Sequence, residues 1–439
     1  MMHRKSFGRR AFLGVVSTSF GASALGRTPH AGRLRLGIPW PITSLDPAAL
    51  NDGFSASFAA AVFEPLFATD ASGKPYPALA SKLPSPSAEG VRISLRPGLR
   101  TGSGRALSGA DVLASVERAR TRGAAGLLGE VEPPRLDAKD PLSVIFPKAE
   151  PEQLSLLLAS PLLAVVPRGF SPLAPDGTGA FRMDIAPGRA LMTRNMQATR
   201  GPAYLDAVEI SAVTDLAELL RGFEAGSSDV GWFGAGLYRA VKDAVPFDTP
   251  RYGFAVLASG RLAGAWGAPG TLQTLLDGVA PEQLRHLGLR GLPNQSQATQ
   301  RWGGPTIELA VPSACPQLLA LARALVSTLS TPGHELRVVE KPPDEIARLR
   351  VSRQFGLMLD FVRSPGLGDR DAEHALRTAV NPEAAKRAPK VAAASPRQLA
   401  RSLPLGVVGE LTVHGARKSV FQGLESWNLG AVWLKAPTA

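Results

Sequence analysis

From residue 307 onward, the sequence alternates between short apolar runs and longer runs that carry apolar residues at helical spacing. The short runs span 307–311, 335–339 and 355–361, and the helical runs between them span 316–330 and 344–351. A strand that returns parallel to its predecessor needs a long crossover, which is most often a helix. The alternation therefore predicts an α/β fold with parallel strand pairing.

The amino-terminal half contains further elements of both kinds. We expect strands at 33–38, 91–96 and 229–232 and helices at 54–66, 109–118 and 215–225. Ser108 is the expected N-cap of the second of these helices, and Asp111 lies near its positive end. Residues 386–402 are rich in Ala, Pro and Arg, so a loose connector is expected there. The length of 439 residues allows two or three domains.

The first 24 residues have the layout of a signal peptide. Arg9 and Arg10 end a basic segment and are followed one residue later by Phe-Leu, which resembles the twin-arginine export motif. The uncharged stretch 11–25 is too short to be a membrane anchor, because a spanning helix needs about 20 apolar residues. Small residues favour cleavage after Ala24. We expect 1–24 to be a twin-arginine signal peptide and the mature protein to be a soluble periplasmic monomer that does not span the membrane.

Composition argues against several classes of function. The formal charge is +12, and four of the positive charges lie in residues 1–24, which leaves +8 (12 minus 4) on the mature chain. Its basic residues are scattered singly, so no nucleic-acid-binding surface is expected. The six histidines are isolated and Cys315 is the only cysteine, so neither a metal site nor an intrachain disulfide is expected. Signatures such as Gly-x-Ser-x-Gly, His-Glu-x-x-His and the phosphate-binding loop are absent, so we expect neither an enzyme nor a cofactor.

Several short blocks, in the same order along the chain, resemble family 5 extracellular solute-binding proteins, which include dipeptide-, oligopeptide-, nickel- and opine-binding proteins. The resemblance covers about residues 33–232 well and the remainder poorly. The matching blocks are Ser44-Leu45-Asp46-Pro47, Glu64-Pro65-Leu66, Ala110-Asp111-Val112, Asp176-Gly177-Thr178-Gly179-Ala180-Phe181, Arg194-Asn195, Tyr204-Leu205-Asp206 and Gly226-Ser227-Ser228-Asp229-Val230.

This resemblance implies a two-lobe periplasmic-binding-protein fold of the cluster C type, with an extra domain inserted in the first lobe. The expected ranges are 33–45, 172–250 and 405–439 for the first lobe, 46–171 for the extra domain and 251–404 for the second lobe. The implied function is that of the substrate-binding component of an ABC importer, which captures a small solute by hinge closure and works with separate permease and ATPase subunits. A transport-independent sensor or scaffold with a degenerate cleft is the alternative.

The resemblance also directs attention to the ligand site. In peptide-binding members a carboxylate grips the amino terminus of the ligand, whereas the corresponding region here, 357–365, lacks that pattern and contains Arg363. The solute is therefore expected to be peptide-like, anionic or amphipathic. Candidate ligand-binding residues are Trp232, Phe233, Tyr252 and Arg363. The aromatic residues have core packing as the alternative role. The alternatives for Arg363 are a solvated loop or an ion pair with Asp360 or Asp369.

Overall fold

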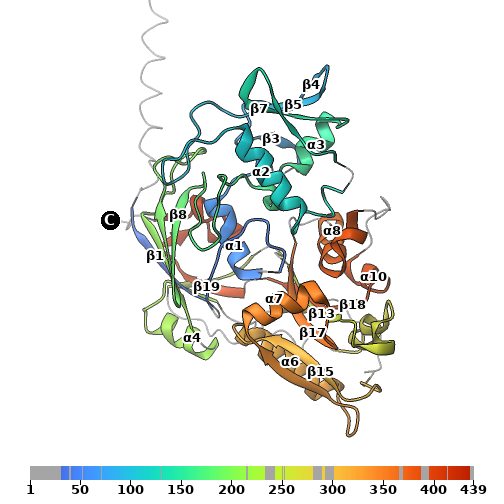
Figure 1. The fold of residues 1–439 in the computed structure, drawn as a ribbon. Helices are drawn as coiled ribbons and strands as arrows, with labels where there is room; N and C mark the ends of the chain where they lie inside the picture. The colour runs from blue at the N-terminus through green and yellow to red at the C-terminus, as the bar shows by residue number, and fades with distance from the viewer. Residues whose placement is uncertain are drawn as a thin grey trace, which may run out of the picture.

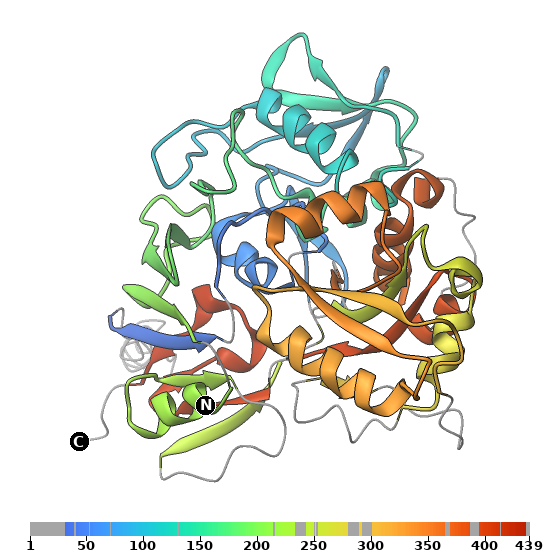
Figure 2. The same ribbon diagram turned by 60° about the horizontal axis from the view of Figure 1, so that its bottom comes forward.

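The computed structural model describes residues 31–435, except 39–40, 52, 71, 130, 214–215, 233–242, 250, 252, 280–288, 292–300, 365–368, 387–394 and 413. The expected signal peptide, Phe233 and Tyr252 lie outside the described residues, so they stay predictions. The described residues form two large sheets, one four-stranded sheet and two two-stranded sheets. The four-stranded sheet lies at the top of both views (Figures 1 and 2). In the described part of the chain, no helix combines the length and apolar composition that crossing a membrane requires.

The first lobe is built on a seven-stranded sheet. Strand β1 pairs in parallel with β10 and β11, and the outer strands of the sheet pair antiparallel. The strand order is β12 (Ala244–Asp248), β19 (His414–Lys418), β11 (Val230–Trp232), β1 (Arg33–Ile38), β10 (Ala207–Ala212), β9 (Arg189–Arg194) and β8 (Phe181–Ala186). The lobe also contains α4 (Leu216–Glu224) and the short strands β20 (Phe421–Gln422) and β21 (Trp433–Leu434). Helix α1 (Gly53–Val62), which precedes the small domain in the chain, shares a hydrophobic core with this sheet.

The second lobe is built on a six-stranded sheet. Its strand order is β14 (Leu289–Gly291), β18 (Leu405–Leu411), β13 (Gly253–Ser259), β17 (Leu357–Arg363), β15 (Ile307–Pro312) and β16 (Leu336–Lys341). The expected parallel pairing is confirmed, because β15 pairs in parallel with both β16 and β17. The connecting helices are α6 (Pro316–Leu329) and α7 (Pro343–Ser352). Strands β13 and β18 run antiparallel to their neighbours.

Helices cover both faces of the second sheet. All seven residues of β13 are buried, as expected for a central strand. Because side chains alternate along a strand, Ala255 and Leu257 share a core with α5 (Thr271–Leu276) and α6, whereas Phe254 and Val256 share a core with α8 (Asp369–Val380) and α10 (Pro396–Ala400). The prediction of a loose connector at 386–402 is wrong for residues 396–400, which form α10. Ser395 and Gln398 form a capping box that starts this helix.

The small domain is built on the four-stranded sheet. It contains β2 (Phe67–Thr69), β3 (Pro75–Pro77), β4 (Ser85–Ser87), β5 (Gly90–Ser94), α2 (Gly109–Arg120), β6 (Arg135–Asp137), β7 (Asp140–Phe146) and α3 (Pro151–Leu157). Helix α2 starts at the expected N-cap, where the backbone N–H of Ser108 donates to Oδ2 of Asp111 at 2.9 Å. Asp111 also accepts the backbone N–H of Arg168 at 2.9 Å. Asp111 therefore ties the start of α2 to a distant loop.

Two boundaries differ from expectation. The helix expected at 54–66 ends at Val62, and Pro65 follows soon after it. The chain was expected to return to the first lobe at residue 405, but β18 belongs to the second sheet through its pairing with β13 and β14. The first lobe resumes only with β19 at His414. The other lobe boundaries stay predictions.

The Gly177-Thr178-Gly179 turn is a packing motif at the end of α1. The N–H of Gly179 donates to the carbonyl of Val62 at 2.9 Å, and the Asn195 side chain donates to the carbonyl of Gly179 at 2.8 Å. A Cβ on Gly179 would lie 2.5 Å from the Ala61 carbonyl oxygen. Glycine is required here because only its bare backbone can approach the helix end this closely. The two family-like blocks that contain Gly179 and Asn195 therefore have a structural role.

Candidate functional site

The two chain crossovers between the lobes lie side by side. Strand β12 leads out of the first lobe and pairs with β19, which leads back into it, with Asp248 opposite His414. His414 Nδ1 lies 2.5 Å from Asp248 Oδ1, and Arg251 donates to Glu410 Oε1 at 3.0 Å. These pairs link the outgoing and returning segments on both sides of the crossover. In α/β sheets, ligands bind outside the carboxyl ends of the strands, so the region next to the crossovers is the candidate site.

The structure places the backbones of two predicted site residues at strand ends next to the crossovers. Trp232 ends β11, where it pairs with Gly415, and Arg363 ends β17, where it pairs with Gly253. Gly253 directly follows Tyr252 in the chain. The ligand-binding roles of Trp232, Phe233, Tyr252 and Arg363 stay predictions.

Arg363 is part of the contact between the lobes. Its side chain is buried, with 6% of the residue exposed, so the solvated loop that we weighed for it is wrong. Its Nη1 donates to the carbonyl of Pro47 at 2.9 Å, and its backbone N–H donates to the carbonyl of Leu50 at 2.7 Å. The segment 47–51, which leads into α1, is therefore held against the end of β17.

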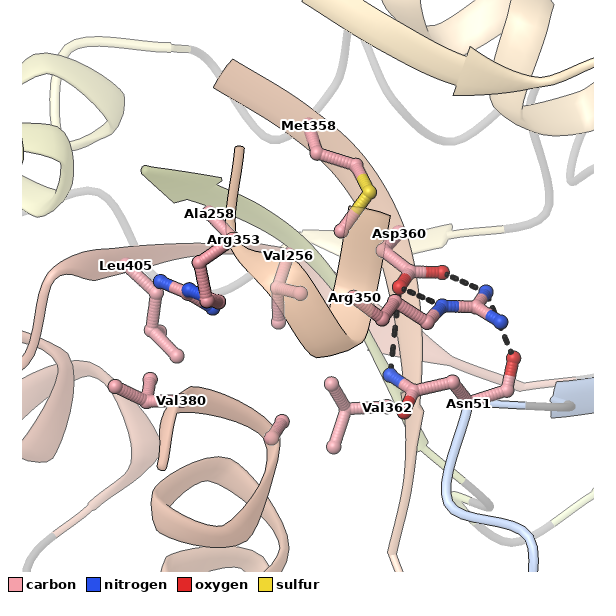
Figure 3. A pocket seen from close by; sticks show the side chains of 11 residues that line it. Asn51, Val256, Ala258, Arg350, Arg353, Met358, Asp360, Val362, Val380 and Leu405 are labelled. Carbon is pink, nitrogen blue, oxygen red and sulfur yellow. Dashed lines mark hydrogen bonds and ion pairs between the residues drawn. The ribbon is translucent and has the colours of Figure 1, made fainter. Parts of the chain in front are cut away.

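A small pocket lies beside this contact, between α7 and α8 on the second sheet (Figure 3). Its volume is about 20 Å³, which is room for roughly one water molecule. Most of its walls are apolar, and its polar residues come from α7, β17 and the segment 47–51. The lining residues are Asn51, Val256, Ala258, Arg350, Arg353, Met358, Asp360, Val362, Ala379, Val380 and Leu405.

Asp360 is the only carboxylate among the residues that line the pocket, and its oxygens are fully engaged. Arg350 grips it with two bonds of 2.7 Å, one from Nε and one from Nη2. The backbone N–H of Phe361 donates to it at 2.8 Å, and the Asn51 amide donates to it at 3.3 Å. An ionised carboxylate has about four acceptor positions, so a cationic ligand group would have to displace a protein donor to bind here.

Asn51 connects the two lobes at this pocket. Besides its bond to Asp360, its amide donates to the carbonyl of Phe361 at 3.0 Å. Its own carbonyl accepts from Arg350 Nη2 at 3.3 Å. Figure 3 shows these bonds converging at one side of the pocket. Asn51 therefore contacts the second lobe on both sides of the Arg350–Asp360 ion pair.

Arg353 lines the other side of the pocket, near Leu405 (Figure 3). It donates to the carbonyl of Ser259, and its guanidinium lies 5.3 Å from the centre of the Phe355 ring. Burial, assisted by the neighbouring charge of Arg261, lowers the pKa of Arg353. No carboxylate in the described part of the chain forms an ion pair with it. Within that same part, no group of three or more His, Cys, Asp or Glu side chains could hold a metal ion.

Sequence reasoning missed Asn51, Arg350 and Arg353, and it named Asp360 only as an alternative partner of Arg363, whereas the structure pairs Asp360 with Arg350. One signal was visible, because Asp360 interrupts the apolar run Leu-Met-Leu-Asp-Phe-Val of β17. A charged residue inside an otherwise apolar strand needs a partner. The partners themselves lie on α7 and, 309 residues earlier, at Asn51.

Comparison with known proteins identifies the fold. No protein-family model and no curated protein sequence matches this chain. Solved structures do match over 93% of the chain. Pheromone receptor PrgZ has a TM-score of 0.70 at 13% identity, with 100% of its own chain covered. The oligopeptide-binding protein AppA from Bacillus subtilis, in complex with a nonapeptide, has a TM-score of 0.68 at 12% identity, with 100% covered. AgaA from A. tumefaciens R10, in complex with agropinic acid, has a TM-score of 0.67 at 16% identity, with 99% covered.

These similarities show the two-lobe fold of family 5 solute-binding proteins, in agreement with the expectation from the sequence blocks. The structural similarity covers 93% of the chain, so it extends into the carboxyl-terminal half, where the sequence resemblance was poor.

Proposed function

We propose that this chain is the substrate-binding component of an ABC importer. It captures a small solute between its lobes and presents the closed form to separate permease and ATPase subunits. The proposal includes export by the twin-arginine route and a binding role without catalysis. We assign 33–45, 172–250 and 414–439 to the first lobe, 46–171 to the extra domain and 251–411 to the second lobe.

The observation that carries the proposal is the pair of crossovers next to the carboxyl ends of the strands. Two backbone segments side by side act as a hinge, because a small change in their dihedral angles rotates one lobe against the other. The Asp248–His414 and Arg251–Glu410 pairs hold the segments together during such a motion. Closure buries a ligand between two protein surfaces, which supplies much of its binding free energy.

We propose Trp232, Phe233, Tyr252 and Arg363 as ligand-binding residues. They belong to, or directly adjoin, strand ends that face the crossovers. The engaged state of Asp360 argues against capture of a ligand ammonium group at that carboxylate. The proposed solute is therefore peptide-like, anionic or amphipathic, and a group that pairs with a guanidinium is favoured.

A second function, that of a sensor or scaffold independent of transport, is favoured by one observation. The segment 47–51 already bonds to Arg363, Asp360 and Phe361, so contacts within the protein occupy groups that a ligand could use. A gene beside permease and ATPase genes favours import, and a gene beside a sensor kinase favours signalling.

Native mass spectrometry of the mature protein, purified without denaturation, tests the proposal. We expect one low-mass species bound at a ratio of one per chain, released by mild collisional activation. If protein from cells grown on several media is always free of ligand, and none of the extracted metabolites binds, importer function is refuted.

A further inference from the structure

The pocket between α7 and α8 carries an excess of positive charge. Two arginines and one aspartate line it, and the carboxylate of Asp360 is already gripped by Arg350. The second positive charge of the pocket is the guanidinium of Arg353, and no carboxylate in the described part of the chain pairs with it. Its hydrogen bond to Ser259 uses only one of its N–H groups.

The surroundings of Arg353 favour an anion. Arg261 adds a second positive charge nearby, and this charge together with burial lowers the pKa of Arg353. The facing walls, Val256, Val380 and Leu405, offer no polar side-chain atoms. Charges attract more strongly beside apolar walls than in water, because the local dielectric constant is lower. An anion next to Arg353 would neutralise a charge that the chain itself leaves uncompensated.

The size of the pocket limits what can enter. Its volume of about 20 Å³ is enough to hold a water molecule. Among anions, a halide ion and a single carboxylate group come nearest to this size. A larger solute could place only one end here.

We propose that Arg353 binds a small monovalent anionic group in this pocket, either a free halide-sized anion or the carboxylate of a captured solute. The carboxylate source rests on the proposed function, and the free-anion source does not. Arg363, the arginine that the sequence suggested for a similar role, bonds to the Pro47 carbonyl through its Nη1. Asn51 lines the same pocket from the first lobe, so an anion there would lie at the contact between the lobes.

Bromide is the probe, because it is close to chloride in size and scatters anomalously. Crystals of the mature protein grown in sodium bromide should show an anomalous peak within hydrogen-bonding distance of the Arg353 guanidinium. Density for water alone, or bromide only at other sites, overturns the proposal.

Thermal unfolding in solution provides the second measurement. Bromide replaces gluconate at constant ionic strength, and the rise in Tm gives the affinity through mass action. We expect Arg353→Gln to weaken bromide binding by roughly 10–100-fold, the scale of a hydrogen bond to a charged group. Arg261→Gln is the matched control, because Arg261 is exposed and acts only through its charge. An Arg353→Gln protein that responds to bromide like the unmodified protein refutes the assignment, and its Tm in gluconate reports whether it folds.

Competition separates the two sources of the anion. If the carboxylate of the solute identified by mass spectrometry enters the pocket, bromide weakens binding of that solute and Arg353→Gln does the same. If a free anion enters, bromide binds and solute affinity does not fall. Either result supports the assignment of Arg353. If a solute binds while bromide and Arg353→Gln both have no effect, the anion site is refuted and the importer proposal stays intact. If bromide binds and no solute is found, the anion site is supported and the importer proposal is not.

Discussion

Removal of the Arg350 side chain should destabilise the protein far more than removal of a neighbouring arginine on the same helix. The carboxylate of Asp360 is 4% exposed and Arg350 is 28% exposed, so the variant Arg350→Met leaves a buried charge without its ionic partner. Loss of one partner of a buried pair costs about 3–5 kcal/mol. Because Phe361 N–H and the Asn51 amide still donate to Asp360, we expect the lower end, about 3 kcal/mol.

Arg348→Met is the matched control for this experiment. Arg348 pairs with Asp344 one turn away at 3.0 Å, and both side chains are 74% exposed. Such a pair contributes at most about 0.5 kcal/mol. Methionine and arginine have similar helix propensities, so α7 itself is not weakened in either variant.

Urea unfolding followed by circular dichroism and by tryptophan fluorescence measures both losses. The two probes must give the same transition before a free energy is assigned, because a multi-lobe protein can unfold in steps. A cost for Arg350→Met below about 1 kcal/mol, or equal to that of Arg348→Met, refutes the view that Asp360 is a buried charge dependent on Arg350.

Three further predictions follow from the structure and the sequence. Gly179→Ala should destabilise the protein by about 1–3 kcal/mol, because its Cβ would lie 2.5 Å from the Ala61 carbonyl oxygen. The control Gly303→Ala should be nearly neutral, because no atom lies within 4 Å of the added Cβ. Equal urea midpoints for the two variants contradict this prediction. Burial opposes ionisation of Asp229, but hydrogen bonds from Arg35 and Lys418 outweigh it and hold its pKa below the ordinary value. Its stabilising effect is thus present above the unfolded-state pKa of about 4 and is lost as the pH falls through the folded-state pKa, so the stability difference from Asp229→Asn should shrink in acid; a constant difference from pH 7 to pH 3 contradicts it. Replacement of Arg9 and Arg10 by lysines should leave precursor in the cytoplasm; normal periplasmic levels on fractionation would rule out the twin-arginine route.

Local patterns predicted the elements of the second lobe well. The strand expected at 307–311 is β15, and the helix expected at 316–330 is α6, because period and β-branched content are properties of neighbouring residues. The antiparallel placement of β18 next to β13 was missed, since that pairing joins segments about 150 residues apart and no local pattern records it. The lobe boundary moved from 405 to beyond 411 for this reason.

The candidate site was harder to predict than the fold. The sequence suggested that Arg363 grips an anionic ligand group, but it could not show that Arg363 is buried and bonds to Pro47 and Leu50 from the other lobe. Asp360 and Arg350 are ten residues apart, on a strand and the preceding helix, so their contact depends on how α7 crosses the sheet. Binding geometry therefore depends on contacts between lobes, which composition and spacing do not contain.

Small-angle X-ray scattering of the mature protein, with and without the solute identified by mass spectrometry, tests solute capture by closure most directly. The ligand-free protein should populate an open form, and saturation with solute should reduce the radius of gyration as the lobes close about the two crossovers. Asp248→Asn, which weakens the pair with His414, should change the ligand-free radius while the bound radius stays the same. An unchanged radius of gyration at saturating solute would contradict capture by hinge closure.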